Sequence, residues 1–103
     1  MKSFTQGLMV RALQRAKAGK PNMFSRIMQE AVPFNRPHRI SITEISPKGC
    51  VVSIPYRRRN LNHIGTMHAC AIAAAGEYVS GLNVIEAFDI SDFRLILSRL
   101  EVD

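Results

Sequence analysis

The chain has 103 residues and a mass of 11.5 kDa, with 14 Lys and Arg against 8 Asp and Glu. This size allows one small domain with a thin core and leaves little room for a second. The apolar content of 47% and the charged fraction of 21% argue against a disordered chain, and no window holds the ~18 uncharged apolar residues of a membrane span. We therefore expect a single soluble domain over residues 1–103 that does not enter a membrane.

The basic residues are concentrated in the first part of the chain. Residues 1–59 hold twelve Lys and Arg against Glu30 and Glu44, a balance of +10, whereas residues 60–103 have a balance of −4. The basic part therefore faces either a polyanion or the acidic part of the chain.

Two short helices are predicted before the first strand. Residues 3–18 have apolar positions at helical spacing among basic residues, and Gly19-Lys20-Pro21 ends this segment. The absence of acids before Glu30 is shared with mitochondrial transit peptides, but no serine-rich run accompanies it, so a basic helix packed on the edge of the fold is the preferred interpretation. A second helix is expected over residues 23–31, which makes residues 1–35 an N-terminal helical part.

From residue 39 the apolar period changes from 3.6 to 2, which indicates a sheet. Residues 39–45 and 50–56 are expected to form a β-hairpin around the turn Ser46-Pro47-Lys48-Gly49. Pro55 places the second strand near an edge or its end.

Residues 67–79 contain ten apolar residues in thirteen, and their only strongly polar members are His68 and Glu77. A helix that is apolar on all sides is usually buried, so we expect a buried central helix. Gly65 and Thr66 stand where a turn and an N-cap belong, and Gly81 stands where a C-cap belongs. Residues 93–102 are compatible with a strand, although a helix is also possible there.

Glu77 is the first candidate for chemistry, because a carboxylate in an apolar helix is expensive to bury without a partner. It either reaches solvent or a basic partner, or acts as a general base. His68 lies nine positions earlier, which places the two side chains on opposite sides of the helix, so a second subunit is the simplest source of a complete site. The free N–H groups at the helix start, including that of Ala69, are a candidate site for a carbonyl oxygen as it becomes negative.

Residues 62–71, Asn-His-Ile-Gly-Thr-Met-His-Ala-Cys-Ala, are followed by Glu77. This block resembles the Asn-x-x-Gly-x-x-His-Gly-Gly-(six residues)-Asp pattern of hotdog-fold acyl-CoA thioesterases, and the resemblance covers roughly residues 34–102. It implies an α+β, hotdog-like fold in which an antiparallel sheet wraps around a long central helix, here preceded by N-terminal helices. The family sheet has further strands after residues 93–102, so the resemblance also implies a domain shortened at its C-terminus.

The resemblance also implies roles for individual residues. Glu77 corresponds to the base or nucleophile, the Ala69 N–H to the group that polarises the carbonyl, and Asn62 to the amide that positions substrate or water. Further substrate contacts are expected from Gly65, Thr66 and His68, and contacts to the phosphates of coenzyme A from Arg57, Arg58 and Arg59. Because the carboxylate and the N–H come from different subunits in this family, a homodimer or a dimer of dimers is implied. No cofactor and no metal is expected.

The block departs from the family pattern in two places. Ala69-Cys70 replaces Gly-Gly, which keeps the N–H but adds a methyl group beside the acyl path, and Glu77 replaces Asp and reaches one methylene further.

Several alternatives remain open at the level of sequence. Cys70 could act as a nucleophile with His68, but the two residues lie about 200° apart on a helix. Together with His63 they could hold zinc, although the spacing matches no closed site and a fourth ligand is missing. His38 is most simply a surface residue, His68 could equally be a satisfied residue at the helix start, and Arg57–Arg59 could be a solvated strand end.

The sequence thus predicts hydrolysis of an acyl-CoA thioester by a dimeric hotdog-fold enzyme. A non-catalytic module for acyl-CoA binding or dimerisation is the alternative. Nucleic-acid binding through the basic part is less favoured because aromatic residues are few and no nucleic-acid motif is recognisable. The absence of a disulfide pattern at Cys50 and Cys70 favours a reducing, cytoplasmic location.

Overall fold

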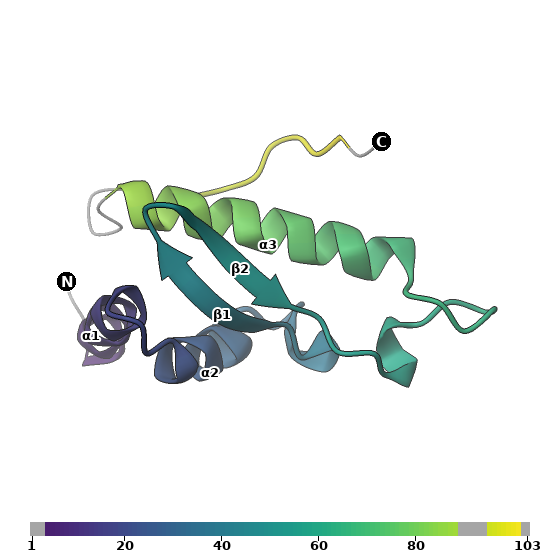
Figure 1. Cartoon of the computed structure of the whole chain (residues 1–103), viewed down its shortest axis with the longest axis horizontal. Helices are drawn as coiled ribbons and strands as arrows, with labels where there is room; N and C mark the ends of the chain where they lie inside the picture. Colours follow the sequence, from purple (N-terminus) through teal and green to yellow (C-terminus); the bar gives the residue numbers. More distant parts are fainter. Residues whose placement is uncertain (1–3, 89–94, 102–103) are drawn as a thin grey trace.

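The computed structural model describes residues 4–88 and 95–101, and it is an α+β fold (Figure 1). Two helices precede a hairpin, and a long helix follows it. The elements are α1 (Phe4–Lys17), α2 (Asn22–Ala31), β1 (Ser41–Ser46), β2 (Gly49–Ser53) and α3 (Ala69–Ala87), with the short 3₁₀ helices η1 (Arg36–His38) and η2 (Arg58–Asn60). The sheet packs along α3, an arrangement compatible with a hotdog-like fold.

The N-terminal helices form where the sequence predicts them. Gly19 ends the α1 region with a φ of +93°, and α2 ends before Pro33, which cannot continue a helix. Ala12, Leu13 and Ala16 of α1 and Phe24 of α2 are buried in the core. This burial confirms α1 as a packed element of the fold.

The predicted hairpin is confirmed. Its turn is Pro47-Lys48, and Gly49 follows with a φ of +142°, a conformation that favours glycine. β1 and β2 pair antiparallel, with a bulge between Ile42 and Glu44. Because of this extra residue, Ile42 and Ile45 both face the core although their spacing is odd. β2 is shorter than expected and ends before Pro55.

α3 has different ends from those expected. His68, not Thr66, is the N-cap, because its ring Nδ1 accepts the Cys70 N–H at 2.9 Å. Gly81 lies inside the helix, which continues to Ala87 because Leu82, 1% exposed, extends the buried face.

The expectation that the central helix is buried on all sides is wrong for the described chain. One face of α3, carrying Ala71, Tyr78 and Leu82, packs on the core. On another face Ile72 is 54% exposed.

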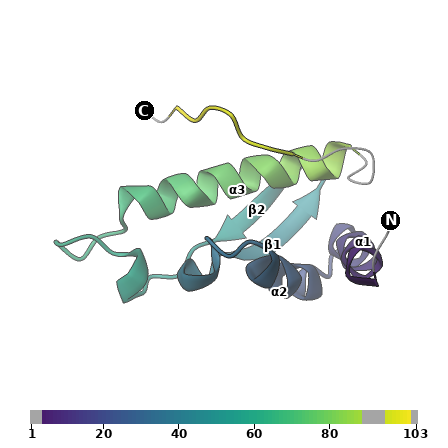
Figure 2. The ribbon, with the colours of Figure 1, turned by 180° about the vertical axis from the view of Figure 1, so that it is seen from behind.

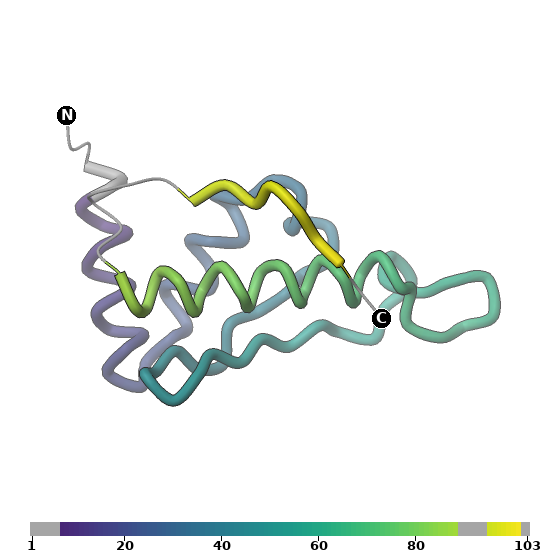
Figure 3. The backbone as a smooth tube through the Cα atoms, turned by 90° about the horizontal axis from the view of Figure 1, so that it is seen from above, coloured from purple at the N-terminus to yellow at the C-terminus, as the bar shows by residue number. Residues whose placement is uncertain are grey.

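Residues 95–101 run beside α3, on the side away from the hairpin (Figures 2 and 3). They form neither a helix nor a paired strand, so the expected strand is not formed over this segment. Residues 93, 94 and 102 of the predicted element lie outside the described residues.

Candidate functional site

The loop before α3 is organised by Asn62. Its Oδ1 accepts the N–H groups of Ile64 and Thr66 at 3.1 and 3.0 Å, and its Nδ2 donates to the Thr66 hydroxyl at 2.6 Å. Gly65 takes a φ of +79°, which closes the turn, and its carbonyl accepts the Tyr56 hydroxyl at 2.6 Å. The Asn62 side chain therefore holds the loop in shape, with both ends of its amide bonded within the loop. Any effect of Asn62 on a substrate would act through the shape of this loop.

The loop leads directly to the start of α3. Ala69 is the first helical residue, and its N–H has no acceptor among the described residues. The residue Ala69 is also solvent-exposed. This N–H, with the helix dipole behind it, remains available to a negatively charged or polarised oxygen.

Glu77 lies in the middle of α3, between two grooves. The first, of about 430 Å³, has Cys70, Ala73, Ala74 and Glu77 as its α3 side, a spacing that puts these residues on one helix face. Its other walls are Val32, Phe34 and Asn35 from the connection after α2, and Leu97 and Leu100 from the C-terminal segment. The second groove, of about 260 Å³, continues past Glu77 along Ser80, Gly81 and Val84, with residues 95–98 as its other wall.

Glu77 is half-buried, and its carboxylate has no hydrogen bond or ion pair among the described residues. Neither a basic partner nor full exposure to solvent therefore explains the presence of a carboxylate in this apolar helix. The apolar walls that surround it, contributed by Val32, Phe34, Leu97 and Leu100, were not predicted as site residues. Phe34 offered one signal in the sequence, because it is a large apolar residue directly after Pro33.

Glu77 and the Ala69 N–H do not meet within one chain. They are eight residues apart on the same helix, which is about 12 Å along its axis. A carbonyl about 3 Å from the Ala69 nitrogen would therefore lie outside the hydrogen-bond reach of Glu77 in the same chain.

The three arginines lie at η2, before the loop. Arg57 is half-buried, whereas Arg58 and Arg59 are exposed, and none of the three has an ion pair with another described residue. Their guanidinium groups remain available to an anionic partner.

The described residues form neither the Cys70–His68 nucleophile pair nor the zinc site that the sequence left open. The Nδ1 of His68 is engaged by the Cys70 N–H and not by its thiol, so these residues form no nucleophile–base pair. No group of three His, Cys, Asp or Glu side chains could hold a metal within the described ranges, so His63, His68 and Cys70 are not brought together. The raised pKa of the Cys50 thiol, caused first by burial, favours its uncharged form.

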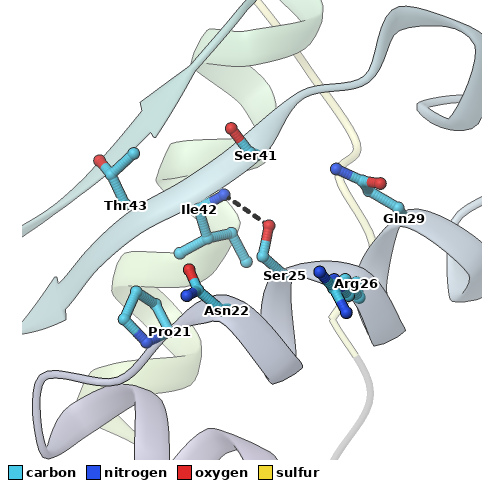
Figure 4. Close-up of a pocket in the computed structure, with 8 residues that line it drawn as sticks. All are labelled: Pro21, Asn22, Ser25, Arg26, Gln29, Ser41, Ile42 and Thr43. Atoms are coloured by element: carbon cyan, nitrogen blue, oxygen red, sulfur yellow. Dashed lines mark hydrogen bonds between the residues drawn. The ribbon is translucent and has the colours of Figure 1, made fainter.

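A third pocket, of about 600 Å³, lies between the start of α2 and the outer edge of β1 (Figure 4). Ser25 Oγ accepts the Ile42 N–H there at 2.9 Å, and Gln29 Nε2 donates to the Ile40 carbonyl at 3.3 Å. These side chains complete the hydrogen bonds of the strand edge. The lining includes no carboxylate, cysteine or histidine. The polar side chains of this pocket are therefore explained by their role in holding α2 against β1.

His38, expected at the surface, is half-buried, which corrects that expectation. Its ring nitrogen Nδ1 lies 2.8 Å from Oδ1 of Asn60, a residue that is fully buried. Nothing in the sequence distinguishes Asn60 from the other loop asparagines.

No helix in the described part of the chain is long and apolar enough to cross a membrane. No curated protein and no solved structure gave a match in comparisons with known proteins. One family model matches residues 20–103, and its description is "Domain of unknown function (DUF4442)". Since this match covers more than half of the sequence, the chain belongs to the DUF4442 family.

Proposed function

We propose that the chain hydrolyses an acyl-CoA thioester with Glu77 as the general base. The observation that carries the proposal is the half-buried Glu77, whose carboxylate is unpaired among the described residues, between two largely apolar grooves. An apolar groove suits an acyl chain, and a carboxylate at its side can take a proton from water. The resemblance of residues 62–77 to the thioesterase pattern supports the same assignment.

In the proposed reaction, the water oxygen attacks the thioester carbonyl carbon while Glu77 takes the proton. The carbonyl oxygen becomes negative and accepts a hydrogen bond from the Ala69 N–H. The carbon–sulfur bond then breaks, the proton passes to the sulfur, and the products are a carboxylic acid and the free thiol of coenzyme A.

We propose that a second copy of the chain supplies the second group of each site. The distance of about 12 Å along α3 between Ala69 and Glu77 supports this arrangement. The exposed Ile72 on α3 supplies apolar surface for such a contact. Each site of the homodimer would combine Glu77 of one copy with the Ala69 N–H of the other.

Arg57, Arg58 and Arg59 are proposed to bind the phosphates of coenzyme A. Guanidinium groups pair with phosphate through two parallel hydrogen bonds. η2 lies only a few residues before the loop that leads to Ala69, and this nearness of positive charge supports the proposal.

The test is turnover of a series of acyl-CoA esters of increasing chain length, followed by release of the thiol. We expect Glu77→Gln to lower kcat by about 10²–10⁴-fold, the usual contribution of a general base. Glu86→Gln is the matched control, because Glu86 is also a half-buried glutamate of α3 but does not line either groove, and it should stay within about twofold of wild type.

Wild-type protein without turnover on the whole series, or turnover unchanged by Glu77→Gln, would contradict the catalytic proposal. Saturable binding of an acyl-CoA ester without turnover would instead indicate the non-catalytic binding module.

A further inference from the structure

Asn60 connects three separate parts of the chain and is 0% exposed. Its Nδ2 donates to the carbonyls of His38 and Pro55 at 3.0 and 2.9 Å, and its main-chain N–H donates to the Arg57 carbonyl at 2.8 Å. Its main-chain carbonyl accepts the His68 N–H at 2.7 Å. The residue therefore links η1, the segment after β2 and the N-cap of α3.

These contacts fix the proton on the His38 ring. Both amide hydrogens of Asn60 point to carbonyl oxygens, so Oδ1 is the atom that faces His38 Nδ1 at 2.8 Å. Since Oδ1 only accepts hydrogen bonds, Nδ1 must carry the hydrogen and donate it. The Nε2 of His38 has no partner among the described residues.

The same network reaches the start of α3. The Asn60 carbonyl holds the main chain of His68, the residue directly before Ala69. The side-chain bonds of Asn60, together with its main-chain bond to the Arg57 carbonyl, hold that carbonyl in place. Any displacement of Asn60 therefore moves the Ala69 N–H, a donor that must meet its oxygen within a few tenths of an ångström to act.

We propose that His38 and Asn60 form a positioning pair that sets the Ala69 N–H at the start of α3. The proposal rests on the function proposed above, because that function makes this N–H a catalytic donor. His38 acts through its Nδ1 hydrogen and Asn60, and it does not touch the substrate.

Two substitutions of His38 separate this role from the alternatives. In His38→Asn the short side-chain amide places an N–H group near the position of Nδ1, whereas in His38→Gln the longer amide reaches the position of Nε2. A positioning role through Nδ1 predicts rescue by asparagine alone. If His38 instead acted as a general base through Nε2, His38→Asn would not restore activity.

We expect His38→Asn to keep kcat within about twofold and His38→Gln to lower kcat about tenfold, with KM within about twofold for both. Removal of an oxyanion donor lowers kcat about 10²–10³-fold. A smaller loss of kcat is expected here because the Ala69 N–H is displaced but still present. Ser25→Ala is the control for stability alone, because it removes a buried bond to the Ile42 N–H that is not part of the network around Asn60. It should lower the melting temperature and leave kcat unchanged.

A second measurement does not depend on turnover. Hydrogen exchange of the His68 amide, followed by NMR, should speed up about tenfold in His38→Gln and stay near the wild-type rate in His38→Asn and Ser25→Ala. Equal exchange rates in the two His38 variants, or a faster rate in His38→Asn, would overturn the positioning pair. If no acyl-CoA ester is hydrolysed, the proposed function fails, and the exchange rates still decide whether His38 positions the helix start.

Discussion

Replacing Ala69 with proline removes one hydrogen atom from the proposed site and little else. Ala69 is the first residue of α3, the helix position at which proline is favoured. His68 has φ −66° and ψ +137°, the extended conformation that a residue before proline requires. The Ala69 N–H has no acceptor among the described residues, so the substitution costs no hydrogen bond in that part of the fold.

The stability of Ala69→Pro should therefore stay within about 0.5 kcal/mol of wild type, or rise slightly because proline restricts the unfolded chain. Its kcat should fall by about 10²–10³-fold, or about 2.7–4 kcal/mol in activation free energy, since one oxyanion donor is lost. Chemical unfolding measures the first effect and acyl-CoA hydrolysis the second. Ala69→Gly keeps the N–H and is the matched control.

An Ala69→Pro protein that folds normally and retains wild-type kcat would refute the assignment of this N–H. Equal losses of activity in Ala69→Pro and Ala69→Gly would also refute it, because glycine leaves the donor in place.

Two further predictions concern the surface arginines and the core. Arg58→Ala combined with Arg59→Ala should raise KM for acyl-CoA about three- to tenfold, most at low salt, because both side chains are exposed. KM for an N-acetylcysteamine thioester, which lacks the phosphates, should not change, and Lys48→Ala in the hairpin turn is the charge control; a loss common to both substrates would contradict the contact. Tyr78→Phe should raise the free energy of unfolding by about 1 kcal/mol, since the buried Tyr78 hydroxyl has no hydrogen-bond partner among the described residues. Burial raises the pKa of Tyr78, so above about pH 10 only the unfolded state loses this proton and wild-type stability falls by up to ~1.4 kcal/mol per pH unit relative to Tyr78→Phe. An equal change in the free energy of unfolding of the two proteins from pH 9 to 11 would contradict this.

Local patterns in the sequence were sufficient to predict the helices, the hairpin and the central helix. The hairpin follows from β-branched residues around Pro47-Lys48-Gly49, and both signals depend on neighbours in the chain. The predicted end of α3 was wrong because Gly81, a residue type that commonly ends helices, lies within this helix. Packing of Leu82 in the core overrides the preference of that glycine.

The candidate site was only partly accessible from sequence. Glu77 and Asn62 stand in a recognisable spacing, whereas the groove walls come from Phe34 and Leu97, which lie about forty and twenty positions away. The bond between His38 and Asn60 joins residues 22 positions apart, and no periodicity predicts such a pair. Contacts of this kind depend on how η1 and η2 meet in the folded chain.

Mixing two inactive variants tests the central claim most directly, because it requires Glu77, the Ala69 N–H and a second copy at once. Glu77→Gln and Ala69→Pro proteins are unfolded together, refolded at equal concentrations, and assayed for acyl-CoA hydrolysis. If each site combines groups from two copies, half of the dimers are mixed and each contains one intact site, so about a quarter of the wild-type activity should return. Confirmed mixed dimers with no more activity than either variant alone would contradict the account.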